Sequence, residues 1–382
     1  MRGAAGLAQT GTYPDRTDYY FFRAPAYPAF LALVTFGHPD RIALAKVAGA
    51  AAASLTPLFT AALAARLFRR RGVALAAGFA ATLDPSLVYL STDIQSEVIF
   101  VPLLLAAGVS LLAALDRPST SLALGAGLLL AGAALARPSA LALSPLLLAP
   151  LFDRRWPVRA RAHLAGAAAL GLVLGLAPWT ARNALRFHEL ILVSDSAGAT
   201  SYDGNSIWTP RLYDARSREE LGQLVAAMEE HKRAHVAALP PDVAASPSAR
   251  SRSFLRLSLA ELAADRAAAL RLYTRKIWEW LRPYPSPVYW PAPVVISVGI
   301  YDVILYALAA AGMVTAARRG AVLFSLLYLA LTMLTHMAFL VVWRHRVPYW
   351  NPVLLVYAAA LAGDTLARWR KRSREGRALG LG

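Results

Sequence analysis

Long apolar runs recur along this chain and limit the class of fold that it can adopt. A helix needs about 20 apolar residues to cross the hydrocarbon core of a bilayer. Hydrophobic residues make up 57% of the 382 residues and charged residues 16%, which is too apolar for an ordinary soluble domain. We predict an all-α polytopic membrane protein with about nine transmembrane segments, at residues 42–68, 73–90, 98–115, 120–136, 139–152, 163–180, 294–317, 321–342 and 353–367.

The run at 139–152 allows two interpretations. It is short and contains Pro145 and Pro150, so it suits either a transmembrane helix or a re-entrant segment. A re-entrant segment would reverse the orientation of every later helix. The distribution of basic residues is therefore the observation that decides the topology.

Basic residues gather in short clusters between the apolar runs. With an unbroken alternation of crossings, all these clusters fall on one side of the membrane, which the positive-inside rule identifies as cytoplasmic. They lie at residues 69–71, 117, 154–161, 318–319 and 368–377. The same clusters account for the net charge of +17, so we expect no nucleic-acid partner.

This topology divides the chain into five parts. We expect an extracytoplasmic N-terminal segment (1–41), an N-terminal transmembrane bundle (42–180), an extracytoplasmic loop domain (181–293), C-terminal transmembrane helices (294–367) and a basic cytoplasmic tail (368–382). A polar segment of this length, translocated with no signal peptide of its own, leads us to expect that an upstream helix is absent from this sequence.

The loop domain shows its own patterns. Residues 216–238 are charged and helical in pattern, whereas the prolines and serines of 240–253 predict a mobile loop. Residues 254–281 are amphipathic, which suits either a helix on the outer leaflet or a helix of a domain core.

Several kinds of site are absent from the sequence. The chain has no cysteine, which excludes disulfides, Cys-ligated zinc and thiol nucleophiles. No HExxH motif is present, so we predict no metal site and no cofactor. Gly125, Gly127 and Gly132 lie inside an apolar run with no preceding strand, which favours helix packing over a nucleotide-binding fingerprint.

Two acids interrupt the apolar sequence between residues 87 and 100. Asp93 and Glu97 lie in a short polar turn between two predicted spans. An ionisable group at the edge of the hydrocarbon region is costly, which makes it a candidate for a functional site. The alternative is a loop with ordinary solvated charges, and this alternative is stronger for Asp93, because Glu97 opens the next apolar run.

Arginines also recur on the predicted outer face, against the positive-inside tendency. Each guanidinium taken alone is better explained as an interfacial anchor than as a binding group. Together, however, several planar cationic forks suit the oxygens of a phosphate. We therefore predict a pocket for an anionic lipid head group, lined by Arg23, Arg137, Arg182, Arg344 and Arg346.

Five segments carry a resemblance to a known class of enzyme. The segments are RAPAYPAFLAL, LSTDIQSEVIFVPLLLAAG, LARPSALAL, PWTARNALRFHELILVSDSAG with the following DGN, and RHRVPYWNPVLLVYAA. In order and spacing they resemble integral-membrane glycosyltransferases of the GT-C class, in the bacterial group related to protein O-mannosyltransferases and lipid A aminoarabinose transferases.

The resemblance implies a GT-C-like helix bundle with its active site on the outer face of a bacterial-type cytoplasmic (inner) membrane. The implied reaction moves a sugar from a polyprenyl-phosphate donor to a lipid, glycan or protein acceptor. In such enzymes an aspartate of the first external loop is the general base, and basic residues hold the departing lipid phosphate. Fixed cations are most useful where negative charge develops.

The resemblance also assigns roles to residues. Glu97 matches an acid of the family, whereas the matching catalytic aspartate would precede Met1, which leaves Asp18 as the substitute in this loop. Tyr27, Asp93 and His345 join the five arginines as substrate-binding candidates, with Arg344 and Arg346 assigned to the lipid phosphate. The competing interpretation is a non-enzymatic flippase or transporter of lipid-linked sugars, which would show repeated halves.

Overall fold

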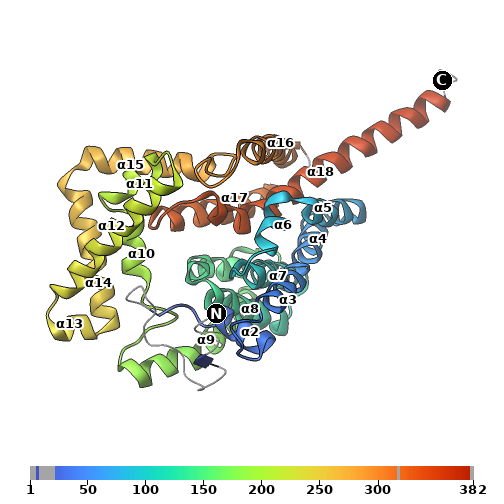
Figure 1. Cartoon of the computed structure of the whole chain (residues 1–382). Helices are drawn as coiled ribbons and strands as arrows, with labels where there is room; N and C mark the ends of the chain where they lie inside the picture. Colours follow the sequence, from blue (N-terminus) through green and yellow to red (C-terminus); the bar gives the residue numbers. More distant parts are fainter. Residues whose placement is uncertain (1–5, 8–21, 316–318, 379–382) are drawn as a thin grey trace.

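The computed structural model describes residues 6–7, 22–315 and 319–378, and helices are the only regular secondary structure in these ranges (Figure 1). The first half contains α2 (Ala26–Thr35), α3 (Ile42–Ala53), α4 (Leu55–Phe68), α5 (Arg71–Leu83), α6 (Pro85–Ser91), α7 (Glu97–Asp116), α8 (Thr120–Ala136), the 3₁₀-helix η1 (Pro138–Phe152) and α9 (Val158–Phe187). The second half contains α10 (Ala197–Gly204), α11 (Trp208–Asp214), α12 (Arg218–Ala237), α13 (Pro241–Ala245), α14 (Pro247–Ala264), α15 (Arg266–Leu281), α16 (Ala292–Thr315), α17 (Arg319–Met337) and α18 (Trp343–Ala378).

Every predicted apolar run overlaps a helix, and the prediction of an all-α polytopic membrane protein is confirmed. In the described ranges, five helices are long and apolar enough to cross a membrane by length and composition. The number becomes six if α5 and α6, which meet at a bend of 59°, form one broken span. Helices α2, α8 and η1 are apolar but shorter, and α2 is an apolar helix that the sequence analysis did not count.

The 3₁₀ geometry of η1 explains how so short a run can extend so far. Pro145 and Pro150 lie inside this 15-residue helix, and each removes a backbone donor that an α-helix would use. A 3₁₀-helix rises about 2.0 Å per residue, so 15 residues reach about 30 Å, close to the thickness of the hydrocarbon core.

Helix α7 defines two ends of the bundle, because Glu97 is its first residue and Asp116 its last. Twenty α-helical residues are about 30 Å long. At the Asp116 end, Arg69 pairs with Asp116 (2.7 Å) and Arg70 pairs with Asp364 of α18. The Arg155 guanidinium also donates to the carbonyl of Leu115 at this end. Two of the predicted cytoplasmic clusters, 69–71 and 154–161, therefore meet at this end of α7, which we call the basic end.

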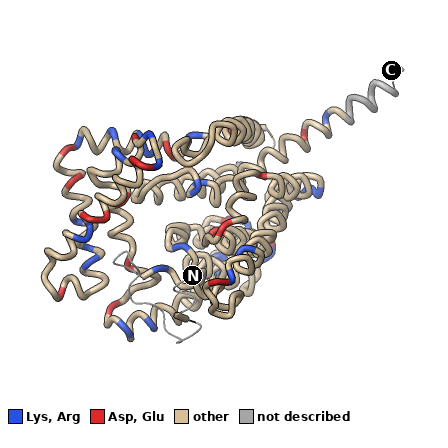
Figure 2. The backbone as a smooth tube through the Cα atoms, in the orientation of Figure 1, with Lys and Arg blue, Asp and Glu red and all other residues tan. Residues whose placement is uncertain are grey.

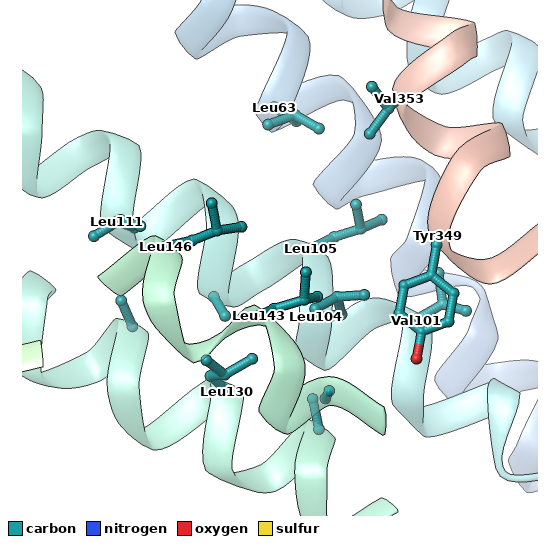
Figure 3. Close-up of a cluster of buried hydrophobic side chains, with 14 of the residues drawn as sticks. Leu63, Val101, Leu104, Leu105, Leu111, Leu130, Leu143, Leu146, Tyr349 and Val353 are labelled. Carbon is teal, nitrogen blue, oxygen red and sulfur yellow. The ribbon is translucent and has the colours of Figure 1, made fainter. Parts of the chain in front are cut away.

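Small residues bring the helices of the bundle close together. An added Cβ at Gly127 of α8 would lie 1.9 Å from the Ala168 carbonyl oxygen, and one at Gly171 of α9 would lie 2.1 Å from that of Leu124. The core of the bundle includes leucines and valines from α4, α7, α8, η1 and α18, together with Tyr349 (Figure 3). Backbone contact of this kind is typical of membrane helices, where packing drives association.

Helices α10 to α15 gather at the end opposite the projecting C-terminal part of α18 (Figure 1). Charged residues are frequent along them and sparse along the apolar helices (Figure 2). Their core contains Tyr202, Met228 and Phe254, and a buried ion pair joins Arg250 to Asp195 (3.0 Å). The predicted helix at 216–238 is confirmed as α12.

The prediction of a mobile loop at 240–253 is wrong. Pro241 and Pro247 each begin a helix, and the Ser246 hydroxyl accepts from the N–H of Ala249 (3.0 Å) as the N-cap of α14. Proline at the first helical position needs no N–H partner, so these prolines start helices rather than interrupt structure. The amphipathic stretch is likewise two helices, because Asp265 ends α14 and caps α15.

The crossing of α8 and α9 yields a stability prediction. Replacing Gly127 by alanine forces the two backbones apart and should lower the stability of the detergent-solubilised protein by about 1–3 kcal/mol. Thermal unfolding followed by a fluorescent probe measures the loss. Gly166→Ala in α9 is the matched control, because no neighbour lies within 4 Å of its added Cβ. Equal midpoints for the two variants would refute the close packing.

Candidate functional site

The turn between α6 and α7 carries both predicted acids. Helix α6 begins at Pro85 and ends after two turns at Ser91, which returns the chain to α7 through a short polar turn. The Asp93 carboxylate accepts from the N–H of Ile94 (2.8 Å) and from the Gln95 side chain (3.0 Å). Asp93 is thereby held in place at the surface beside the start of α7.

Glu97 and Arg137 form a buried ion pair at this end of the bundle. Glu97 is 5% exposed and the Arg137 side chain 17%. Arg137 follows α8 and precedes Pro138, and its extended backbone is the conformation that a following proline favours. Its guanidinium also lies over the Phe100 ring (5.7 Å). The pair thus joins the start of α7 to the junction of α8 and η1.

Arg344 is an exposed cation of this site. It lies in the first turn of α18, is exposed, and makes no ion pair or hydrogen bond with the residues that the structure describes. It interacts electrostatically with Glu97 and Asp93. Hydrogen bonds from Gln95 and Ile94 lower the pKa of Asp93, and the charges of Lys46 and Arg344 lower it further.

Tyr27 and His345 complete the group. Tyr27 of α2 packs in one apolar cluster with Ile94, which lies in the same turn as Asp93. His345 follows Arg344, and its Nδ1 lies 3.2 Å from the Leu340 carbonyl oxygen. The structure therefore brings together four segments: α2, the α6–α7 turn, the α8–η1 junction, and the first turn of α18 with the linker before it.

Tyr349 connects this group to the core. Its hydroxyl lies 2.7 Å from that of Ser139 in η1, and its ring packs edge-on against Phe100 (5.2 Å). Because Phe100 also underlies Arg137, the same aromatic pair supports the cationic side of the ion pair and the start of α18.

Arg346 does not belong to the group formed by Tyr27, Asp93, Glu97, Arg137 and Arg344, although the sequence assigned it to the lipid phosphate. Its side chain is fully buried, and it pairs with Asp302 of α16 (2.6 Å) and donates to the carbonyls of Trp280 (3.2 Å) and Arg282 (2.6 Å). A guanidinium with no exposed surface cannot reach a lipid phosphate in this conformation. Among the two predicted phosphate ligands, the geometry favours Arg344.

Arg182 and Arg23 lie in a second neighbourhood. The Arg182 guanidinium lies over the rings of Trp179 (5.0 Å) and Phe187 (5.4 Å). Phe22 stacks on Phe187 (5.1 Å), which places the neighbouring, exposed Arg23 beside the same aromatic cluster. Asp18, the predicted base, lies outside the described residues.

Sequence reasoning missed Asp84, a fully buried acid between α5 and α6. Its carboxylate accepts from the N–H groups of Ser86 (2.9 Å) and Leu87 (2.8 Å), the Tyr301 hydroxyl (3.0 Å) and the Asn351 amide (3.0 Å). The Asp84-Pro85 pair inside an apolar run is an N-cap signal. This signal alone predicts a break in the run at 73–90, where α5 ends and α6 begins.

The described residues contain no group of three or more His, Cys, Asp or Glu side chains that could hold a metal ion.

Two comparisons address the family. The family model described as dolichyl-phosphate-mannose-protein mannosyltransferase matches residues 23–179, which include Tyr27, Asp93, Glu97 and Arg137. No sequence match was found among curated proteins.

Solved structures provide the decisive likeness. The archaeal oligosaccharyltransferase AglB from Archaeoglobus fulgidus, in complex with an inhibitory peptide and a dolichol-phosphate, superposes with a TM-score of 0.59 at 12% identity over 98% of this chain. This chain has a GT-C fold. The predicted GT-C-like helix bundle is thus confirmed as the fold. The apo form of the A. fulgidus enzyme gives a TM-score of 0.58 at 13% identity over 100% of this chain.

The GT-C chain described here spans about half of AglB, because the two alignments cover 47% and 48% of that protein. ArnT from Cupriavidus metallidurans bound to undecaprenyl phosphate also matches, at 13% identity over 95% of this chain and 72% of ArnT, with a TM-score of 0.40.

The ion pair of this GT-C bundle yields a double-mutant prediction. Glu97→Gln and Arg137→Gln each leave one buried charge without its partner, which should cost about 3–5 kcal/mol. The double variant should lose less than the sum of the two, because neither charge remains. Thermal unfolding in detergent measures all three.

Arg233→Gln is the control for that cycle. Arg233 pairs with Glu230 at 2.7 Å, but both side chains are well exposed, so its loss should be below about 1 kcal/mol. Additive losses for Glu97 and Arg137 would show that the two charges are independent and that water solvates each one.

Proposed function

We propose that this protein transfers a sugar from a polyprenyl-phosphate donor to an acceptor at the extracytoplasmic face of the membrane. The observation that carries the proposal is the exposed, unpaired Arg344 beside the buried Glu97–Arg137 pair. In this reaction the bond between the anomeric carbon and the phosphate oxygen breaks, and negative charge develops on the phosphate. A fixed cation at that point stabilises the transition state.

The charges of the site suit an anionic leaving group. Asp93 and Glu97 are the acids of the group, and Lys46, Arg137 and Arg344 are its cations. Because Glu97 is occupied by Arg137, it orients that cation rather than attacking the sugar. The proton of the acceptor hydroxyl passes to a base, for which Asp18 remains our candidate.

The arrangement of α7 supports the proposed face. Glu97 is the first residue of α7, and the basic end lies at the last residue, Asp116, about 30 Å away along the helix. Clustered arginines are typical of the cytoplasmic side. This distribution supports the proposal that the candidate site, at the opposite end of α7, is extracytoplasmic.

Supporting evidence for the donor class comes from two sources. The matched family model is named for a dolichyl-phosphate-mannose enzyme, and AglB has been solved with a dolichol-phosphate. Both names contain a phosphate linked to a polyprenyl-type lipid. This shared chemistry agrees with the cationic surplus of the candidate site.

Replacing Arg344 by alanine tests the function directly. We expect transfer to fall by about 100-fold or more, the usual loss when one charge-stabilising donor is removed. Arg344→Lys should retain intermediate activity, because an ammonium keeps the charge but lacks the planar fork. The measurement is the glycolipid formed when each variant complements a knockout strain. Arg256→Ala, at an exposed position of α14, is the control; normal transfer by Arg344→Ala would remove this residue from the site.

Binding of the reaction product can be tested without turnover. Polyprenyl phosphate at about 100 times its Kd should stabilise the purified protein by about 2.7 kcal/mol, and Arg344→Ala should lose most of this shift. Uncharged polyprenol is the matched ligand control, because it presents the same tail without the phosphate. A similar shift with polyprenol would show that the tail alone is recognised.

A further inference from the structure

The linker at residues 338–342 connects α17 to α18 and ends just before Trp343 and Arg344. It is not a free loop. Val341 is fully buried and packs in one cluster with Trp280 of α15 and Met337 of α17. Helices of the loop segment (residues 181–293) make three contacts with the backbone of this linker and of Met337, the residue before it.

Lys276 of α15 is the first of these contacts. Its side chain is fully buried, and Nζ donates to the Gly204 carbonyl (3.0 Å), the Asn205 side-chain oxygen (2.8 Å) and the Met337 carbonyl (2.5 Å). An ammonium group has three N–H donors, and these three oxygens come from two separate parts of the chain. Lys276 therefore joins the end of α10 to the end of α17.

Asn205 and Gly204 form the second contact. The Asn205 amide donates to the Ala338 carbonyl (2.8 Å). An added Cβ at Gly204 would lie 2.0 Å from the Phe339 carbonyl carbon and 2.3 Å from the Leu340 nitrogen. Only a residue without a side chain allows α10 to approach the linker this closely.

Tyr213 of α11 provides the third contact, because its hydroxyl accepts from the N–H of Val341 (3.1 Å). On the other side of Arg344, the Arg346 guanidinium binds the carbonyls of Trp280 and Arg282 at the end of α15. The backbone before Arg344 and the Arg346 side chain after it are therefore both attached to the loop helices.

We propose that helices α10, α11 and α15 hold the linker so that Arg344 faces the donor phosphate, with Lys276, Asn205 and Tyr213 as positioning residues. This inference rests on the proposed function, because it assigns Arg344 to a lipid-linked phosphate. None of the three residues touches the substrate. Their effect passes through the linker backbone to the first turn of α18.

The absence of cysteine from the sequence provides a structural test that needs no activity. Val341→Cys introduces the only thiol of the chain at a fully buried position of the linker. In this background, Lys276→Met should raise the rate of maleimide labelling by about tenfold or more, and Tyr213→Phe should raise it by a smaller factor. Each substitution removes hydrogen bonds that keep the linker packed and residue 341 buried.

Arg271→Met is the matched control for that measurement, because Arg271 lies on the same helix with a side chain that is 71% exposed. It should leave the labelling rate unchanged. Equal labelling of the Lys276, Tyr213 and Arg271 variants would overturn the proposal, whether or not the protein transfers sugar.

Kinetics in the cysteine-free protein then test positioning. Tyr213→Phe removes one hydroxyl and keeps the ring, so the fold should persist. We expect its KM for the polyprenyl-phosphate donor to rise by about tenfold, the factor for one lost hydrogen bond, with the KM for the acceptor unchanged. Faster labelling with an unchanged donor KM would show that the linker does not position Arg344. If the labelling rates change as expected but the protein transfers no sugar, the proposed function is contradicted, and the attachment of the linker to the loop helices is not.

Discussion

The buried pair of Glu97 and Arg137 is the constraint on which the candidate site depends. Either charge alone would be costly in this environment, so the two must stay together. The pair therefore fixes the start of α7 against the junction of α8 and η1. It also neutralises Glu97, which leaves Arg344 as a cation whose charge is available to a ligand.

Two more acids are buried deeper in the bundle, and each is satisfied differently. Asp302 has a cationic partner in Arg346, whereas Asp84 is held by four neutral donors. A carboxylate with several N–H and O–H donors can stay buried without a counter-ion. Because Asp84 bonds side chains of α16 and α18 and Asp302 bonds Arg346 of α18, the two acids hold α6, α16 and α18 together.

The sequence predicted the apolar helices well, because hydrophobic length is a local property. It also predicted a single pocket of five arginines beside Asp93 and Glu97, but Arg182 and Arg23 lie by another aromatic cluster, and Arg346 is buried. It could not separate Arg344 from Arg346, although they are two residues apart. They lie in the same helical turn, and only the positions of α15 and α16 decide which of the two is buried.

The loop segment shows the same limit in another form. Prolines at 241 and 247 suggested flexibility, yet each begins a helix, because the residue before it adopts the extended conformation that lets a helix start there. Lys276 gave no signal at all in the sequence. Its three oxygen partners come from residues 61 to 72 positions away, and long-range contacts of this kind leave no local pattern.

Helix α18 links several of these features, because its first turns contact both the bundle and α15. Arg344 faces the candidate site, Arg346 binds the end of α15, and Asn351 donates to Asp84 at the break between α5 and α6. Pro348 and Pro352 remove two backbone bonds from this same stretch. The stretch therefore derives its shape from side-chain contacts with the bundle and the loop helices, and a change in either is transmitted to Arg344.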